Sequence, residues 1–267
     1  MVSGDIHGRA RLLAAYDAKL RTDAETSNAI SVECLGLLRL AVFAGGRGFI
    51  TYQNLNGVKA SGIRELVRDA LNYYLLRTEI DSVEWKTRAH DVAPGLHESL
   101  IGSGFVADES ESIMIGDASG LAVDVALPPE VSLRRITDEH NVRAMCAMQH
   151  EVFGDPVSVH MADAVLARLA SADGLELWIA EADGEIVSAG RLEPVSGTEF
   201  AGIWGGATRE EWRGRGIYRA LTAARARSAL SMGKTLLHSD STEYSRPILE
   251  RAGLVAVSTT TPYVWNR

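Results

Sequence analysis

The sequence has little cysteine and no long apolar run. Cys34 and Cys146 are its only cysteines, and neither lies in a CxxC motif or near a histidine cluster, so we expect neither a disulfide framework nor a metal site. The richest apolar run, Leu35 to Phe43, is interrupted by Arg39 and is far shorter than the roughly 18 residues of a membrane span. The first residues show no cationic or apolar leader. We therefore expect a cytoplasmic protein with no membrane partner.

Positive charge is also scarce. The chain has 27 Lys and Arg against 35 Asp and Glu, a formal net charge of −8, so we expect no nucleic-acid partner. What is abundant is apolar: hydrophobic residues make up 46% of the 267 residues, enough for a buried core. This length favours two domains. Pro128 and Pro129 follow a stretch of small residues and mark the best linker, which predicts domains at 1–127 and 128–267.

The half that follows this linker alternates strands and helices. We expect strands at 131–136, 175–181, 185–192, 200–206, 235–238 and 254–265, and helices near 142–153, 161–170, 217–224 and 245–252. Asp183 and Gly184 separate two alternating runs, which favours a type I′ hairpin turn. In the first of these helices Val142, Met145, Cys146, Gln149 and Phe153 follow near-helical spacing, so this face is expected to be buried.

The first half repeats much of this order. A hairpin is expected between Cys34–Phe43 and Gly48–Tyr52, then a helix at 63–74, a strand at 83–88, a helix at 96–103 and a strand at 105–115. Asp91 and Asp240 follow corresponding strands 149 residues apart, and Gly104 and Gly253 end corresponding helices at the same distance. The shared offset indicates a duplicated fold, with a chance coincidence as the alternative.

A turn rich in glycine and arginine joins the strand at 200–206 to the helix that begins near Ile217. At such a junction the first helical N–H groups have no intrahelical partner, and Gly214 and Gly216 allow the backbone to approach a bulky anion. Six arginines lie between 209 and 227. The segment therefore predicts a diphosphate-binding turn, and the alternative is an ordinary turn followed by a solvated helix face. A Rossmann site would need glycine where Arg219 stands, and no P-loop motif occurs.

The segment Glu211–Gly216, followed by Ile217 and the pair Ala220-Leu221, resembles the Q/R-x-x-G-x-G/A signature of the GNAT superfamily of acyl-CoA-dependent N-acetyltransferases. The order of strands and helices from 131 to 265 is similar to the whole GNAT fold. The resemblance implies a mixed α+β protein of two GNAT-like units, each a twisted, mostly antiparallel sheet flanked by helices. The catalytic unit would span 128–267, and the unit at 1–127 would be truncated and degenerate, because its turn at 55–63 has no Arg-Gly-x-Gly.

The resemblance also implies acetyl-CoA as cosubstrate, without a metal. The backbone from Trp204 to Ala207 would bind the pantetheine arm, and the turn would bind the diphosphate, although Glu211 replaces the usual Gln or Arg. The implied cofactor-binding residues are Trp204, Gly205, Gly206, Ala207, Arg213, Gly214, Arg215, Gly216, Ile217, Tyr218 and Thr242.

Acetyl transfer requires a neutral amine, whereas an alkyl amine with a pKa of about 10.4 is neutral about once in 10³ at pH 7. A general base or a desolvating pocket must compensate. The resemblance suggests Glu199 or Glu193 as the base, with a solvated strand-end charge as the alternative for each; His238 is a third candidate. The tyrosine that protonates the leaving thiolate in many members is Leu249 here. Ser245, one helical turn earlier, is a candidate replacement or simply a helix N-cap.

We therefore expect an acetyl-CoA-dependent N-acetyltransferase that moves the acetyl group to a primary amine of a small-molecule or peptide acceptor by direct attack. A non-catalytic acyl-CoA sensor or interaction module is the alternative, because the usual general acid is missing. No motif in the sequence encodes the acceptor or the oligomeric state.

Overall fold

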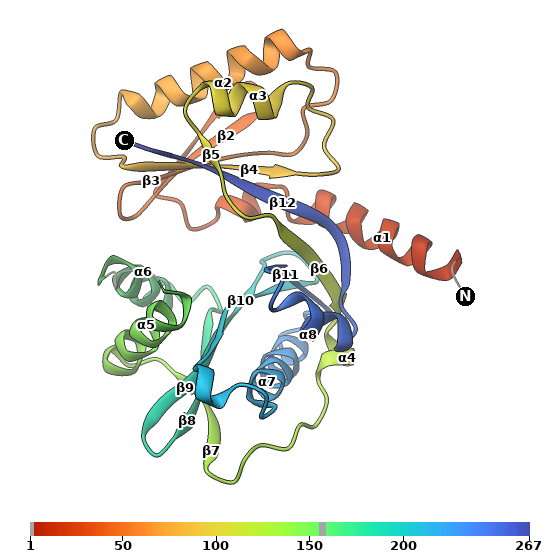
Figure 1. Cartoon of the computed structure of the whole chain (residues 1–267), viewed down its shortest axis with the longest axis vertical. Helices are drawn as coiled ribbons and strands as arrows, with labels where there is room; N and C mark the ends of the chain where they lie inside the picture. The colour runs from red at the N-terminus through yellow and green to blue at the C-terminus, as the bar shows by residue number, and fades with distance from the viewer. Residues whose placement is uncertain (1–2, 155–158) are drawn as a thin grey trace. The chain divides into compact units, whose positions relative to one another are not determined.

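The structure, a computed structural model, describes residues 3–154 and 159–267 and contains two compact units (Figure 1). The first unit consists of the chain up to Ile113 together with Asp240–Glu243 and Ala256–Arg267, and the second consists of Met114–Ser239 and Tyr244–Val255. Each unit is thus discontinuous in the chain, whereas the expected boundary after residue 127 is a single cut. The assignment of separate roles to residues 1–127 and 128–267 stays a prediction.

The first unit is a sheet with the strand order β1-β2-β3-β4-β12, in which β5 also pairs with β12. Strands β3 and β4 are parallel and the other neighbours are antiparallel. Helices α2 and α3 cover one face, and α1 lies on the other (Figure 1). The elements are α1 (Ser3–Lys19), the 3₁₀ helix η1 (Asp23–Thr26), β1 (Ser31–Leu35), β2 (Leu38–Phe43), β3 (Arg47–Tyr52), α2 (Ala60–Leu75), β4 (Ser82–Arg88), α3 (Leu96–Gly102), β5 (Val106–Ala107) and β12 (Val255–Asn266).

The core of this unit follows the apolar spacing of α2. Ile63, Val67, Ala70 and Tyr74 recur at three- and four-residue intervals, and all four are buried against the sheet with Trp85 of β4. The expected helix at 63–74 is therefore present, and its apolar stripe faces the core.

The second unit is a sheet with the order β11-β10-β9-β8-β7. Strands β10 and β11 are parallel and the other neighbours are antiparallel. Helices α5 and α6 pack on one face, and α7 and α8 on the other (Figure 1). The elements are α4 (Ala118–Leu121), β7 (Val131–Ile136), α5 (Glu139–Phe153), α6 (Val159–Ala170), β8 (Glu176–Ala182), β9 (Glu185–Pro194), β10 (Phe200–Thr208), the 3₁₀ helix η2 (Glu210–Trp212), α7 (Ile217–Ser231), β11 (Leu236–Ser241) and α8 (Arg246–Arg251); β6 (Glu111–Asp117) runs from the first unit into the second. The predicted class, mostly antiparallel sheets flanked by helices, is confirmed.

Some local predictions were wrong. The segment 34–43 is two strands rather than one, because Gly36, at a φ of 59°, turns the chain between β1 and β2. Helix α1 was not predicted. On α5 Cys146 is buried as expected, but Phe153 at the last helical position is 53% exposed. None of the helices described is both long and apolar enough to cross a bilayer.

Candidate functional site

Strands β10 and β11 separate towards their carboxyl ends. They pair only from Phe200 to Gly202 on β10 and from Leu236 to His238 on β11, although β10 continues to Thr208. The edge of β10 that faces β11 therefore leaves the parallel ladder after Gly202. The carboxyl ends of parallel strands are where ligands bind in open α/β sheets, so this divergence is the first element of a site.

A bulge lies on β10 next to this divergence. The register between β9 and β10 shifts between Trp204 and Ala207, which leaves Gly205 and Gly206 outside regular pairing. Gly205 has a φ of 58°, a conformation that favours glycine. The four residues predicted to bind pantetheine thus form the bulge and its two flanks.

The side chain of Trp204 folds back along the strand towards β11. Its ring meets the ring of His238 edge-on, with centroids 5.2 Å apart. A Cβ on Gly202 would lie 2.1 Å from the Trp204 indole nitrogen, so only glycine fits there. Trp204 and His238 therefore line the point where the two strands part.

The predicted diphosphate turn has the expected form. Gly214 and Gly216 have φ values of 74° and 80°, and α7 begins at Ile217, whose buried side chain packs in an apolar cluster. Ala220 donates to the Gly216 carbonyl in the first helical hydrogen bond, so the N–H groups of residues 217–219 precede the helical ladder. A Cβ on Gly214 would meet nothing within 4 Å. No described side chain fills the space beside this glycine.

Arginine side chains surround the same turn. Arg213 donates from Nε to the Thr208 carbonyl at 3.1 Å. Arg215 lies 3.5 Å from Glu130 and stacks over the Trp212 ring at 4.6 Å. Both arginines are exposed, as is Glu211. The N–H groups at the helix start, the helix dipole and two guanidinium groups give this corner a positive potential in an acidic chain.

On the α7 face the bulge rests on a tyrosine and a buried arginine. A Cβ on Gly206 would lie 2.6 Å from the Tyr218 ring, and one on Gly190 would lie 2.5 Å from the Arg225 guanidinium. Arg225 donates to the Arg191 carbonyl and to Thr222 Oγ1, each at 3.2 Å. Burial lowers the pKa of this guanidinium. The absence of a side chain at Gly206 and Gly190 therefore leaves room for Tyr218 and Arg225 against the sheet.

The two candidate carboxylates lie at different places. Glu193 pairs in the β9–β10 register with Gly202, at the divergence, and its carboxylate is held by Arg168 at 2.7 Å and Arg191 at 3.1 Å. Glu199 precedes β10 and lies at the closed end of the strand pair, six residues or about 20 Å from Gly205 along the strand. Of the two, the structure brings only Glu193 close to the bulge.

The remaining predicted residues lie after β11. Ser245 occupies the N-cap position of α8 but makes no side-chain capping bond. Leu249, where the family tyrosine would stand, is fully buried. Thr242 is exposed and directly follows β11. A hollow of about 80 Å³ lies between α4, α7 and α8 in the second unit, and Leu249 and Arg219 are among its lining residues.

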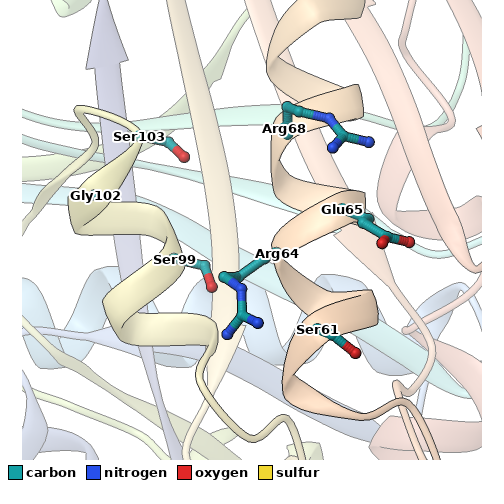
Figure 2. A pocket seen from close by; sticks show the side chains of 7 residues that line it. All are labelled: Ser61, Arg64, Glu65, Arg68, Ser99, Gly102 and Ser103. Carbon is teal, nitrogen blue, oxygen red and sulfur yellow. The ribbon is translucent and has the colours of Figure 1, made fainter.

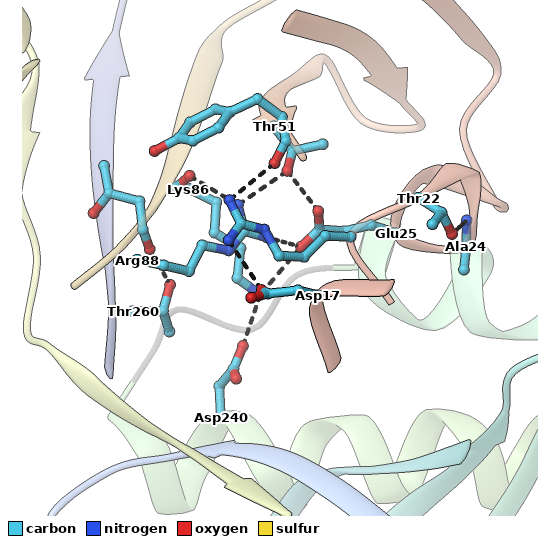
Figure 3. Close-up of polar contacts among 12 residues, drawn as sticks. Asp17, Thr22, Ala24, Glu25, Thr51, Lys86, Arg88, Asp240 and Thr260 are labelled. Atoms are coloured by element: carbon cyan, nitrogen blue, oxygen red, sulfur yellow. Dashed lines mark hydrogen bonds and ion pairs between the residues drawn. The ribbon is translucent and has the colours of Figure 1, made fainter. Parts of the chain in front are cut away.

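The matching parallel strands of the first unit are tied together by buried charges. Beyond the paired residues of β3 and β4, Arg88 of β4 donates to Thr51 Oγ1 of β3 at 3.1 Å and pairs with Glu25 of η1 (Figure 3). Arg21 joins the two strand ends by donating to the Tyr52 carbonyl at 3.2 Å and pairing with Asp91 at 2.8 Å. Side chains of the first unit itself therefore fill this place.

A hollow of the first unit lies apart from these strand ends. It measures about 470 Å³ and lies between α2 and α3 (Figure 2), lined by Ser61, Arg64, Glu65, Arg68, Ser99, Gly102 and Ser103. Arg64, Glu65 and Arg68 are exposed, and Arg68 pairs with its neighbour Asp69 at 2.8 Å. This is an open groove between two surface helices, without the glycine turn of the second unit.

Comparisons with known proteins agree with this geometry. Residues 116–238 match the family described as an acetyltransferase (GNAT) domain. The chain is similar in structure to a GCN5-related N-acetyltransferase from Kribbella flavida, with 14% identity and a TM-score of 0.68 over 96% of this chain and 95% of that one. A GCN5-related N-acetyltransferase from Sphaerobacter thermophilus gives 16% identity and a TM-score of 0.62, with 86% and 76% covered. No curated protein matches the sequence.

A tandem GNAT protein from the clavulanic acid biosynthesis pathway is also similar, with 14% identity, a TM-score of 0.61 and coverage of 86% of this chain and 78% of that one. At such identities the likeness shows the fold alone, whereas the family match rests on the sequence of residues 116–238. Residues 116–238 therefore match the GNAT acetyltransferase domain in sequence, and the chain has the tandem GNAT fold that its sequence predicted.

Proposed function

We propose that the second unit binds acetyl-CoA and transfers its acetyl group to a primary amine of a small-molecule or peptide acceptor. The observation that carries this proposal is the position of the glycine turn at 213–216 directly after β10, whose edge leaves the ladder and bulges at Gly205 and Gly206. The backbone amides of the turn suit a diphosphate, and the extended strand edge that precedes the turn suits a long arm that contains amide groups.

The chain would hold the cosubstrate mainly through its backbone. N–H groups from Gly214 to Arg219 would bind the diphosphate, and Arg213 and Arg215 would add charge. The edge from Trp204 to Ala207 would bind the pantetheine. The bound thioester supplies an activated acetyl group, and a bulge N–H beside its carbonyl would stabilise the negative charge that develops there.

The proton-transfer groups are proposed with the roles that the sequence suggested. Glu193 is the better placed base, and Arg168 and Arg191 hold its carboxylate in position. Glu199 would have to act through water from the closed strand end. Desolvation near the bulge would therefore also have to lower the pKa of the acceptor amine, so that a larger fraction of it is neutral. Ser245, one helical turn before the buried Leu249, is the proposed donor to the leaving thiolate.

The first unit is proposed to bind no coenzyme, because Arg21 and Arg88 with their carboxylate partners fill its strand opening. The cytoplasm remains the expected place of action.

The proposal is tested by calorimetric titration with acetyl-CoA, with NAD as the control ligand, followed by a thiol-release assay against a panel of amines. We expect micromolar affinity for acetyl-CoA, none for NAD, and thiol release that depends on one class of amine. A folded protein that binds no acetyl-CoA would overturn the proposal.

One observation favours a second candidate, a non-catalytic acyl-CoA sensor. Leu249 stands, fully buried, at the position of the usual tyrosine proton donor, so the usual general acid is absent from this position. Tight acetyl-CoA binding without thiol release for any amine would support the sensor and reject the transferase.

A further inference from the structure

Gln149 is a buried amide that contacts the bulge of β10. It lies on α5, is 1% exposed, and shares its buried face with Met145 and Cys146. Its Nε2 donates to the Gly205 carbonyl at 2.5 Å. Because a carbonyl can only accept, this bond fixes the amide, with the nitrogen towards Gly205 and the oxygen on the other side.

The Oε1 atom of Gln149 has no hydrogen-bond partner within the described part of the chain. A buried acceptor left unmatched costs about 1–3 kcal/mol, and such groups in native proteins require an explanation. A Cβ placed on Gly205 would lie 2.8 Å from Gln149 Nε2 and 3.2 Å from an Arg191 guanidinium nitrogen, so these side chains flank the bulge together. Arg191 in turn pairs with Glu193.

The two faces of the bulge are not equivalent. On the α7 side the Tyr218 ring packs against Gly206, in contact with the buried Arg225. On the α5 side the bulge meets the Gln149 amide and the Arg191 guanidinium. The polar side chains beside the bulge thus lie on the α5 side, and the unmatched oxygen is one of their atoms.

We infer that Gln149 Oε1 accepts a hydrogen bond from the attacking amine and orients it, an inference that rests on the proposed transferase function. A neutral primary amine has two N–H groups and one lone pair, so a bond from one N–H to Oε1 leaves the lone pair free to attack the thioester carbon. As the C–N bond forms, the nitrogen gains positive charge and its bond to Oε1 strengthens. The contact therefore stabilises the transition state more than the bound amine.

The remaining steps balance without another reactant. The nitrogen loses one proton to the base, the C–S bond breaks, and the thiolate takes up a proton to leave as the thiol. Burial raises the pKa of the neighbouring Cys146 thiol, so this cysteine is protonated and acts as packing.

The test replaces Gln149 by Leu, and by Met as a second variant of similar length that also lacks hydrogen-bonding groups. Met148→Leu is the matched control, because Met148 is the adjacent residue of α5, is 2% exposed and packs in the same core. Acetyl-CoA affinity is measured by calorimetry, and transfer is measured with an amine panel that includes hydroxylamine and methylamine.

We expect both Gln149 variants to lose at least 30-fold in kcat/KM for the amine, while acetyl-CoA affinity changes less than threefold and Met148→Leu keeps the wild-type kinetics. A folded variant with kcat/KM within threefold of wild type would overturn the inference alone. So would an equal loss of acetyl-CoA affinity, since Gln149 would then only support the strand. If the wild type binds acetyl-CoA but acetylates no amine, the proposed function fails and the inference fails with it.

Discussion

Gly216 holds the conformation on which the proposed anion site depends. Its φ of 80° places it in the left-handed region immediately before α7, where asparagine and aspartate are tolerated better than other side chains. Aspartate and asparagine have similar size, so a comparison of the two variants separates the effect of the added charge on binding from the effect of backbone strain.

Gly216→Asp should bind acetyl-CoA at least 100-fold more weakly than Gly216→Asn, because a carboxylate about 4 Å from a phosphate costs about 4 kcal/mol at an effective dielectric constant of 20. Calorimetry at low and high salt measures this, and screening should shrink the difference. Lys59→Ala, at the N-cap position of α2 in the first unit, is the control and should leave the affinity unchanged. Equal affinities for the two Gly216 variants would remove the diphosphate from this turn.

Gly206 and Tyr218 are coupled by contact. Gly206→Ala places a methyl group against the Tyr218 ring and should reduce the free energy of unfolding by about 1–3 kcal/mol. In the double variant Gly206→Ala/Tyr218→Ala the clash is absent, so the cost should be at least 1 kcal/mol below the sum of the single changes. Urea unfolding measures the cycle. Gly102→Ala, where a Cβ meets nothing within 4 Å, is the neutral control; additive single effects would show that the ring does not lie there.

Among the elements, strand β4 places the cation Lys86 beside carboxylates of the first unit. Lys86 pairs with Asp240 at 2.7 Å and lies 3.6 Å from Glu25 (Figure 3). Burial alone would lower the pKa of the Lys86 amine, but Asp240, Tyr16 and Glu25 raise it above its ordinary value of 10.5. Burial also raises the pKa of Glu84 and of Glu111, against the opposing effect of Lys86.

Lys86→Met should therefore destabilise the first unit by about 3 kcal/mol at pH 7, because it leaves buried carboxylates without their cation. The loss should shrink as the pH falls through the raised pKa values of Glu84 and Glu111 towards 4.5, where these carboxyls become neutral. In the wild type the contribution of Lys86 is complete below pH 10.5 and is lost only at higher pH. Urea unfolding at several pH values measures this. Arg68→Met removes an exposed pair and should change the stability by less than 0.5 kcal/mol; a pH-independent loss would contradict the assignment.

Local signals predicted most elements, and long-range contacts explain what was missed. Asp183 and Gly184 have φ values of 50° and 81°, the two positive angles that a type I′ hairpin turn requires, as predicted. Helix α1 was missed although Leu12, Tyr16 and Leu20 recur once per turn and are buried. Leu12 is followed by Leu13, Ala14 and Ala15, so the apolar residues of α1 form no clear stripe in the sequence, and the buried face becomes recognisable only with the surface it covers.

The proposed diphosphate turn could be predicted from the sequence because its signal is local, whereas the rest of the candidate site could not. Gly214 and Gly216 lie within three residues of the helix that they introduce. The bulge of β10 depends on α5, β9 and α7, far away in the sequence, and Gln149 appeared only as a core position on an amphipathic helix. A lone amide on an apolar stripe was the available signal. The pairing of Glu193 with Arg168 and Arg191 likewise required the folded sheet.

In the whole molecule, the order of segments along the chain does not match the division into two units. Strand β12 follows the second unit in the sequence, yet it pairs with β4 of the first unit from Thr260 to Asn266. Arg267 continues this attachment by donating to the carbonyls of Ile80 and Tyr74. Residues 1–127 alone therefore lack the strand that completes the sheet of the first unit.

The segment 1–127 expressed alone should not fold cooperatively, because it lacks the β12 partner of β4 and exposes the edge that Trp85 and Val83 lie beside. The same segment with 255–267 restored by a flexible linker should give a cooperative melt and a near-ultraviolet circular dichroism signal. A protease site inserted between Pro128 and Pro129 of the full chain provides the control: cutting it leaves β12 in place and should leave this melt intact. Cooperative unfolding of 1–127 without residues 255–267 would show that the first unit needs no segment from beyond the linker. The single cut expected from the sequence would then describe the folding units better than the discontinuous division does.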